Sequence, residues 1–343
     1  MDKYFKNKVF FITGGTGSFG KAFTKFLLER TQAKKIIIYS RDEQKQFNLQ
    51  NSKEYIKHQN RLRFFIGDIR DYSRLKIAMD NQVDYVIHAA ALKHVSLSEY
   101  NPFETIKTNI IGSQNLIKCC LELKIPNVIA LSTDKASSPI NLYGASKLAA
   151  DKLFVAANAY SKKNSTKFSV VRYGNVMASR GSIIPYLISN YKNKYINVTD
   201  KRMTRFNITL GQSIKFVSDC FKRMIGGEIF VPKLSSYRVT ELVRAICPNS
   251  KIKIIGIRPG EKLHEQMIST SDSLNTIEFK DYYIILPNTG TNQKCNALYN
   301  KKIKKKVCKK VKFGFAYESD KNDHFLSIQE IKKLVKKINL NEN

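Results

Sequence analysis

Short, continuous apolar runs recur along the first half of the chain, and stretches with helical spacing lie between them. The runs are residues 9–12, 36–39, 64–66, 85–87 and 128–131. Strands that read as unbroken apolar runs are typical of a parallel sheet covered by helices on both faces. We therefore predict an α/β fold: a Rossmann-type, doubly wound parallel sheet with right-handed crossovers over residues 1–176.

The second half of the chain leaves room for a smaller unit. With 343 residues, the length does not limit the size of the core. We expect residues 177–343 to form mainly a smaller, mixed C-terminal substrate-binding domain, with chain crossings between the two parts.

A glycine-rich turn follows the first apolar run. Gly14, Gly17 and Gly20 form a G-x-x-G-x-x-G pattern directly before a helical stretch. In such a turn the first glycine permits a tight bend, the second lets backbone approach a pyrophosphate, and the third allows close helix–strand packing. The N-terminus of the following helix then faces the negative charge. We predict a dinucleotide site with contacts from Thr13, Gly14, Gly17, Ser18, Phe19 and Gly20.

The end of the second apolar run suggests which dinucleotide binds. Ser40 and Arg41 stand about 20 residues beyond the glycines, where the residue that reads the ribose is expected. The guanidinium of Arg41 can hold a ribose 2′-phosphate, whereas Asp42 lies one residue later and can face solvent. This pattern favours NADP over NAD.

Two further strand ends can contact the same cofactor. Asp68 can accept a hydrogen bond from the adenine amino group while Ile69 packs on its face. The small side chains of Ala89 and Ala90 let the chain pass near the cofactor ribose. Each of these four residues would also suit a plain core position.

A Tyr-x-x-x-Lys spacing supplies a candidate proton acceptor. Tyr143 and Lys147 share one face of a helix, so the ammonium can favour the ionised phenol. The run 128–131 also delivers Thr133, Asp134 and Lys135 to the carboxyl end of a strand, which is the edge where ligands bind in an open parallel sheet. An acid and a base are therefore expected beside the phenol.

Taken in order along nearly the whole chain, these motifs resemble the extended short-chain dehydrogenases/reductases that modify nucleotide sugars. The closest resemblance is to the inverting UDP-N-acetylglucosamine 4,6-dehydratases that open pseudaminic acid synthesis. It rests on residues 13–20, 40–43, 67–71, 88–95, 107–109, 133–135, 172–176, 179–182, 202–206 and 257–262.

The resemblance implies a hydro-lyase reaction that yields UDP-2-acetamido-2,6-dideoxy-L-arabino-hexos-4-ulose, inverted at carbon 5, for surface or flagellin glycosylation. Tyr143, helped by Lys147, takes the carbon-4 hydroxyl proton, and Thr133 hydrogen-bonds that oxygen. Lys135 then abstracts the carbon-5 proton, and Asp134 protonates the carbon-6 hydroxyl as it departs. Tyr143 is a candidate for returning the proton to carbon 5 from the opposite face.

These roles make opposite demands on two neighbouring groups. Lys135 must be neutral, so we expect burial or a nearby cation such as Lys93 or Lys147 to lower its pKa. Asp134 needs a raised pKa. Retaining relatives carry Asp-Glu where this chain has Asp134-Lys135, and relatives that serve capsule N-acetylfucosamine-type sugars carry Met at position 143. Lys135 and Tyr143 therefore favour the pseudaminic acid branch.

The resemblance also implies the remaining contacts. Arginine guanidinium groups can each bind two oxygens of a diphosphate, and a carboxylate can accept hydrogen bonds from ribose hydroxyls. Asn175 is expected to lie between the sugar and the nicotinamide. The implied substrate-binding residues are Lys93, Tyr173, Asn175, Arg180, Thr199, Arg205, Arg258 and Glu261, and Lys93 and Asn109 join the cofactor contacts.

Two other functions remain open at this point. A UDP-hexose 4-epimerase or simple reductase needs the Tyr–Lys pair but no acid and base at 134 and 135. The formal charge of +31 and the Lys-rich residues 301–312 suggest a nucleic-acid-binding or membrane-surface protein. That segment lacks aromatic residues for base stacking, so we expect no nucleic-acid partner.

The remaining composition indicates a cytoplasmic enzyme. The 6 cysteines show no C-x-x-C spacing, and the 5 histidines form no metal pattern, so we predict reduced thiols and no metal. No run approaches the ~18 apolar residues of a membrane helix, and the N-terminus does not read as a signal peptide. We expect no membrane partner, and because relatives oligomerise, we expect a homo-oligomer.

Overall fold

The computed structural model describes residues 3–80, 82–161, 165–177, 182–287 and 293–342. In this part of the chain a ten-stranded sheet has the order β16-β14-β15-β10-β6-β5-β4-β1-β2-β3. Its strands are β1 (Val9–Thr13), β2 (Lys35–Ser40), β3 (Leu62–Ile66), β4 (Tyr85–His88), β5 (Asn127–Thr133), β6 (Lys167–Tyr173), β10 (Ile229–Pro232), β14 (Thr276–Glu278), β15 (Tyr282–Ile285) and β16 (Lys309–Lys310). The strands from β3 to β10 in this order run parallel, and the pairings β10–β15, β15–β14 and β14–β16 are antiparallel. The predicted Rossmann-type sheet is confirmed.

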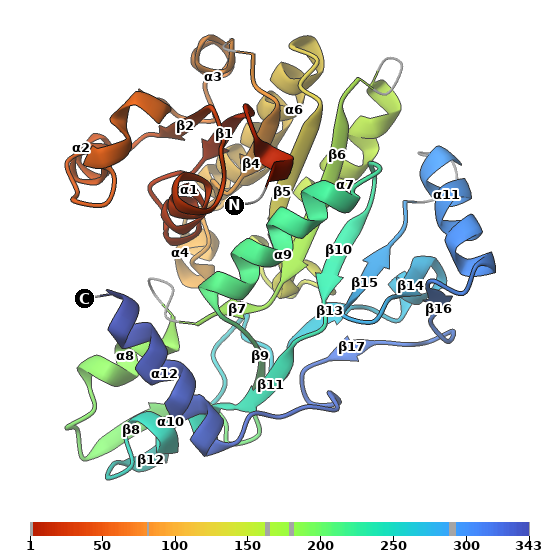
Figure 1. The fold of residues 1–343 in the computed structure, drawn as a ribbon. Helices are drawn as coiled ribbons and strands as arrows, with labels where there is room; N and C mark the ends of the chain where they lie inside the picture. The colour runs from red at the N-terminus through yellow and green to blue at the C-terminus, as the bar shows by residue number, and fades with distance from the viewer. Residues whose placement is uncertain (1–2, 81, 162–164, 178–181, 288–292, 343) are drawn as a thin grey trace.

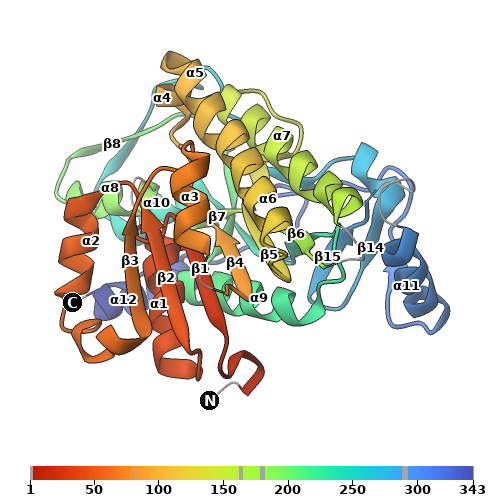
Figure 2. The ribbon, with the colours of Figure 1, turned by 90° about the horizontal axis from the view of Figure 1, so that it is seen from above.

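Helices cover both faces of the sheet (Figure 2). One layer contains α3 (Tyr72–Met79), α6 (Gly112–Glu122) and α7 (Leu142–Ala156), and the other contains α1 (Ser18–Arg30) and α9 (Leu210–Arg223). Successive side chains of a strand point to opposite faces. Phe11 and Ile37 accordingly join the core under α3, α6 and α7, whereas Phe10 and Ile12 join the core under α1 and α9. Burial on both faces explains the unbroken apolar runs.

Shorter elements complete this part. They are the helices α2 (Glu43–Gln50), α4 (Val95–Tyr100), α5 (Pro102–Ile106) and α11 (Gln293–Lys304), and the helical turns η1 (Lys3–Phe5), η2 (Ile56–Arg61), η3 (Lys107–Ile111), η4 (Asp134–Ala136), η5 (Ala157–Tyr160) and η7 (Ser271–Asn275). No helix in the described ranges is both long enough and apolar enough to cross a bilayer.

A smaller lobe lies below the carboxyl edge of the sheet in Figure 1. It contains the helices α8 (Ile183–Ser189), α10 (Val239–Ile246) and α12 (Ile328–Glu342), and the paired strands β8 (Tyr195–Val198) and β12 (Lys251–Ile254). Between the lobe and the sheet lie β7 (Asn175–Val176), β9 (Thr204–Ile208) and β11 (Ser235–Arg238), with the pair β13 (Gln266–Ile268) and β17 (Tyr317–Glu318). The lobe has its own apolar core, which includes Leu187, Val198, Leu242 and Ile331.

The chain passes between the two parts several times after residue 177. It enters the lobe at α8, returns to the sheet with α9 and β10, and enters the lobe again at α10. It then adds β14, β15 and β16 to the sheet and ends in the lobe with α12. Residues from distant parts of the sequence therefore meet where the lobe faces the sheet.

Candidate active site

A cleft of ≈ 1030 Å³ follows the carboxyl ends of the parallel strands. Its walls come from the glycine turn, from the ends of β2 to β5, and from the segment around Asn175. Arg258 and Glu261, from the loop before β13, close the side that belongs to the second half of the chain. The cleft is thus at the edge where ligands bind in open parallel sheets.

The glycine turn is shaped for close approach. Gly14 has a φ of +64°, and a Cβ atom there would lie 2.8 Å from the backbone of Ala89 and Ala90. A Cβ atom on Gly20 would lie 2.6 Å from Gly15 Cα. The helix α1 begins at Ser18 without a side-chain cap, which leaves its first N–H groups directed at the cleft. Such a turn fits a pyrophosphate.

Thr13 supports this turn from below and does not line the cleft. Its buried hydroxyl accepts from the N–H groups of Ala89 (3.2 Å) and Ala90 (3.3 Å) and lies 2.8 Å from His88 Nδ1. Because the hydroxyl accepts twice, it donates its own proton to Nδ1, and Nε2–H of His88 points to Ser113 (3.2 Å). Burial and the charge of Lys147 lower the pKa of His88 to about 3, so this imidazole is neutral.

At the predicted ribose end, the Asp42 carboxylate is occupied by contacts with helix α2, although Asp42 lines the cleft. Its carboxylate accepts from Lys45 N at 2.9 Å as the N-cap of α2 and also binds the Lys45 ammonium, which lowers the pKa of Asp42. Ser40, Arg41, Asp42 and Lys45 line the cleft, and Ser40 Oγ lies 3.0 Å from Thr16 Oγ1. Hydroxyls, two cations and the Lys45-paired carboxylate of Asp42 therefore face this end of the cleft.

The predicted adenine and ribose contacts fall into two groups. Asp68, Ile69, Ala89, Ala90 and Lys93 line the cleft, and Arg70 holds the Asp68 carboxylate at 2.8 Å. Asn109 is buried and does not line the cleft.

Asn109 fixes the loop after β4. Its amide donates to Leu92 O (2.9 Å) and to Ser146 Oγ (3.0 Å), and its oxygen accepts from Leu92 N (2.8 Å). This side chain therefore ties the cofactor-side loop to helix α7.

The two runs predicted to carry catalysis pack directly against each other. Asn141 caps α7 by accepting from Gly144 N at 2.8 Å, and a Cβ atom on Gly144 would lie 2.3 Å from Lys135 O. Only glycine permits this approach. Thr133, Lys135, Tyr143 and Lys147 consequently line the same stretch of the cleft.

The Tyr–Lys pair differs in detail from the expectation. Burial raises the pKa of Tyr143 to about 12, while Lys135 and a hydrogen bond with Thr133 act to lower it. Lys147 donates to Leu131 O at 2.8 Å, and burial lowers the pKa of its ammonium. The cation that most strongly favours the ionised phenol is therefore Lys135.

Lys135 lies between two buried carboxylates. Its Nζ atom is 3.0 Å from Asp134 Oδ1 and 3.0 Å from Glu265 Oε1. Burial lowers the pKa of Lys135, but Asp134 and Glu265 raise it by more, so the pKa lies above its usual range. Our expectation of a lowered pKa is thus wrong, because the two carboxylates raise the pKa of the amine more than burial and the charge of Arg205 lower it.

Asp134 follows the expected direction. Burial and the charge of Glu265 raise its pKa more than Lys135 lowers it, which favours the protonated acid. Its Oδ2 atom is buried and has no hydrogen-bond partner among the described residues. A proton on this oxygen can be given away without breaking another contact.

Glu265 is the buried carboxylate beside Lys135 that sequence reasoning missed. It lies 130 positions beyond Lys135, directly before β13, and is 2% exposed. A lone Glu in a basic chain reads as a surface residue, and only its nearness to the Arg258–Lys262 motif could have drawn attention to it.

The predicted substrate-binding residues separate into lining and supporting positions. Tyr173, Asn175, Arg258 and Glu261 line the cleft, and Lys135 Nζ lies 3.5 Å from Asn175 Oδ1.

Neither Arg205 nor Thr199 lines the cleft. Arg205 is buried, with NH2 3.5 Å from Glu261 Oε1 and Nε 3.4 Å from Glu265 Oε1. Thr199 is buried and donates to the sulfur of Met203. Arg180 lies outside the described residues.

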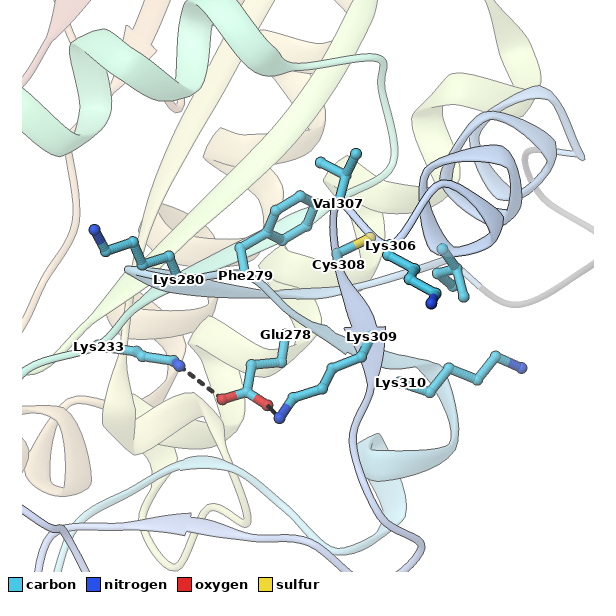
Figure 3. A pocket seen from close by; sticks show the side chains of 10 residues that line it. Lys233, Glu278, Phe279, Lys280, Lys306, Val307, Cys308, Lys309 and Lys310 are labelled. Carbon is cyan, nitrogen blue, oxygen red and sulfur yellow. Dashed lines mark hydrogen bonds and ion pairs between the residues drawn. The ribbon is translucent and has the colours of Figure 1, made fainter.

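The Lys-rich residues 301–312 lie at the far edge of the sheet, away from this cleft. They lie beside a second hollow of ≈ 700 Å³, where Glu278 bridges Lys233 (2.7 Å) and Lys309 (3.2 Å) (Figure 3). Lys309 and Lys310 form the edge strand β16, and lysines on a sheet edge discourage pairing with another strand. Within the described ranges, no His, Cys, Asp and Glu side chains gather in a set that could hold a metal ion.

Residues 10–287 match the family model described as polysaccharide biosynthesis protein. A protein from Campylobacter jejuni strain 81-176 named UDP-N-acetylglucosamine 4,6-dehydratase (inverting) is 52% identical over 96% of this chain and 98% of its own. The chain belongs to this family of extended short-chain dehydrogenases/reductases.

Other members of the family carry a different name. A Rickettsia canadensis protein named UDP-glucose 4-epimerase is 38% identical over 98% of this chain and 97% of its own. The X-ray structure of Pen from Bacillus thuringiensis aligns with a TM-score of 0.84 and 37% identity, covering 97% of this short-chain dehydrogenase/reductase and 99% of Pen. Family membership therefore leaves dehydration and epimerisation to be separated by the site itself.

Proposed function

We propose that this protein is an NADP-dependent, inverting UDP-N-acetylglucosamine 4,6-dehydratase. The observation that carries the proposal is the position of Lys135 beside Tyr143 in the cleft after β5, with Asp134 buried next to it, 3.0 Å from Lys135 Nζ. An epimerase needs the phenol and no further acid or base, whereas elimination of water needs both. The 52% identity to the Campylobacter jejuni dehydratase supports the same substrate.

The cleft suits a nicotinamide dinucleotide phosphate. The turn at Gly14 fits the pyrophosphate, and Ser40, Arg41 and Lys45 offer hydrogen bonds and positive charge to a ribose 2′-phosphate. The bound nicotinamide supplies the hydride acceptor for oxidation at carbon 4 and the donor for reduction at carbon 6. Because the group is used and regenerated, the enzyme needs no added cofactor.

The chain's own residues perform the proton transfers. Tyr143 takes the carbon-4 hydroxyl proton, and Thr133, which hydrogen-bonds the phenol, holds the same oxygen. The resulting ketone acidifies the proton on carbon 5, which Lys135 removes. Asp134 gives its proton to the carbon-6 hydroxyl, which leaves as water.

The nucleotide end lies against the second half of the chain. Arg258 and Glu261 line the cleft there and would bind the diphosphate and the ribose of the UDP moiety. Arg205 does not line the cleft and would hold Glu261 in position through an ion pair of 3.5 Å.

The product is proposed to enter pseudaminic acid synthesis for flagellin or surface glycans. Tyr143, in place of the Met of the capsule branch, supports this pathway. A ketone at carbon 4 is also the group that a following amino transfer requires.

We further propose that the protein forms a homo-oligomer through α4 and α5. Leu97 is 60% exposed, Tyr100 86% and Phe103 75%, so the two short helices present several large apolar side chains to solvent. Clusters of exposed, large apolar side chains mark interaction surfaces.

The decisive experiment follows UDP-N-acetylglucosamine in deuterated water without added cofactor. We expect a product that has lost one water and carries deuterium at carbon 5, and Lys135→Ala is expected to form none. Lys152→Ala, an exposed lysine of α7, is the matched control and should keep the wild-type rate. A product of unchanged heavy-atom composition would instead indicate epimerisation.

A further inference from the structure

We propose that Glu265 is a positioning residue that holds Lys135 and accepts its proton, so that the elimination is carried out by Asp134, Lys135 and Glu265 together. This inference rests on the proposed dehydratase function. It addresses how an amine that is protonated in the resting site becomes a base.

The geometry places Glu265 for direct proton transfer. Its Oε1 atom is 3.0 Å from Lys135 Nζ, and Lys135 is held from the other side by Asp134. The backbone at Glu265 is fixed by Ser319, which accepts from Glu265 N at 2.9 Å and donates from its own N–H to Glu265 O at 2.8 Å. A proton can therefore move between amine and carboxylate without displacement of the chain.

Both carboxyl groups keep a position for a proton. Asp134 Oδ2 and Glu265 Oε2 are buried and have no hydrogen-bond partner within the described residues. Buried polar atoms are normally paired, so two unpaired carboxylate oxygens beside one amine are unusual. Each carboxyl can be protonated while its other oxygen stays in contact with Lys135.

Charge balance indicates where the protons rest. With all three groups ionised the set would carry one net negative charge in a buried place, which is costly. The pKa of Asp134 is raised, by burial first and by Glu265 second. Burial raises the pKa of Glu265 too, but Lys135 and Arg205 outweigh it and the pKa is lowered. The resting set is a neutral acid, an ammonium and a carboxylate, with no net charge.

From this state the proton transfers of the elimination balance. The N–H bond of Lys135 breaks and an O–H bond forms on Glu265, which leaves a lone pair on nitrogen. This transfer is uphill in the resting site, because the pKa of Lys135 is raised and that of Glu265 is lowered, and it is completed as the amine takes the carbon-5 proton. That lone pair takes the carbon-5 proton, and the C–H electron pair moves into an enolate whose oxygen is held by Tyr143. The enolate then reforms the ketone and a C5=C6 bond, while the carbon-6 oxygen leaves with its bonding pair and the proton of Asp134 as water. The set ends as an ammonium, a carboxylate on Asp134 and a neutral Glu265, again without net charge.

The other charged and titratable groups that face the amine act in predictable directions. Arg205 lies 3.4 Å from Glu265 Oε1 and keeps that carboxyl ionised at rest. Lys262 donates to Ser137 O at 2.7 Å and adds positive charge nearby. Tyr143 takes the carbon-4 hydroxyl proton in the preceding oxidation, so it already carries a proton when Lys135 must lose one. None of these groups accepts the proton of Lys135, and Glu265 is the ionised carboxylate in direct contact with the amine.

Glu265→Gln tests the proposal because the amide keeps the shape and loses the proton acceptor. Two steps are measured on protein with its resident cofactor: reduction of the nicotinamide, seen by its absorbance after mixing with UDP-N-acetylglucosamine, and loss of water with deuterium entering carbon 5. We expect the first step to change less than about threefold and the second to fall by about 10²-fold, within the usual contribution of a positioned acid or base. Raising the pH should partly restore elimination, since Lys135 then loses its proton to solvent, and Glu265→Asp should restore it in part at neutral pH.

Glu228→Gln is the matched control. Glu228 is as deeply buried and accepts from Ser169 Oγ at 2.7 Å and from Gly226 N at 2.8 Å, far from the cleft. Its loss should lower the melting temperature without changing the ratio of the two steps.

Three outcomes are distinct. Equal loss of both steps in Glu265→Gln, or elimination at the wild-type rate, would overturn the role of Glu265 while wild-type dehydration still stands. If Glu265→Gln does not fold, Glu265→Asp decides by the same ratio and the same pH profile. Wild-type protein that forms no dehydrated product would instead overturn the proposed function itself.

Discussion

Lys135 and Glu265 stand 130 positions apart in the sequence, yet their Nζ and Oε1 atoms lie 3.0 Å apart. The contact joins the end of β5 to the segment before β13 and so closes the cleft between the sheet and the second half of the chain. Buried ion pairs are poor sources of stability because desolvation offsets the attraction. A pair retained at this place is better explained by chemistry than by folding.

Arg41→Ala should reduce the preference for NADP. Removing a guanidinium from the ribose end is expected to weaken NADP binding about tenfold, or about 1.4 kcal/mol, and to leave NAD binding nearly unchanged. Titration of cofactor-free protein with each dinucleotide measures this difference. Arg30→Ala, at the exposed end of α1, is the control. Equal weakening of both cofactors would show that Arg41 does not read the 2′-phosphate.

Gly14→Ala should destabilise the protein and empty the cofactor site. Its φ of +64° and the 2.8 Å approach of its Cβ to the Ala89 and Ala90 backbone leave no room for a side chain. We expect a loss of about 1–3 kcal/mol of unfolding free energy, measured in urea. Gly211→Ala in α9, where a Cβ meets nothing within 4 Å, should instead stabilise by about 0.4–1 kcal/mol. Similar changes in both variants would contradict the geometry of the turn.

The parallel sheet could be predicted from the sequence because burial on both faces produces unbroken apolar runs at positions such as 9–12 and 36–39. The glycine turn and the Tyr143–Lys147 spacing could also be predicted, because each depends on residues that are close together in the sequence. The added strands β10, β14, β15 and β16 were not foreseen. Their pairing is decided by contacts between residues far apart in the chain.

The active-site electrostatics show the same limit. The positions of Thr133 and Lys135 followed from the strand end, but the surroundings of Lys135 depend on Glu265, which folding brings in from the second half. Arg205 is buried although an arginine in so basic a chain reads as exposed. Its burial depends on Glu261 and Glu265, and neither contact has a local signature.

Stability should fall as the pH drops below about 6.5, partly because of His88. The pKa of this buried imidazole is lowered from 6.5 to about 3, so the unfolded chain binds the proton first. The contribution of His88 is therefore complete above about pH 6.5 and is lost as the pH falls toward 3, with a slope of up to about 1.4 kcal/mol per pH unit.

Urea unfolding across this pH range tests the role of His88. In His88→Gln the dependence on pH should flatten relative to the wild-type protein, and His58→Gln is the composition-matched control. An unchanged pH dependence in His88→Gln would show that His88 is not held neutral by the fold.

Tyr100→Glu should weaken self-association. Tyr100 is the most exposed of the large apolar side chains on α4 and α5, and a carboxylate there would be desolvated in an interface. Sedimentation velocity is expected to show a shift toward monomer, while Tyr160→Glu, which changes a tyrosine 73% exposed on η5, should not alter the assembly. If Tyr100→Glu sediments like the wild-type protein, α4 and α5 do not form the interface.

The configuration at carbon 5 of the product tests the central claim most directly. Removal of a proton by Lys135 and its return from the opposite face should give the L-arabino 4-keto sugar, which proton NMR of the reaction in ordinary water identifies by its ring coupling constants. We predict that this isomer is the first product of the wild-type enzyme with UDP-N-acetylglucosamine. A first product with the original configuration at carbon 5, or a sugar that keeps its carbon-6 hydroxyl, would contradict the inverting dehydratase.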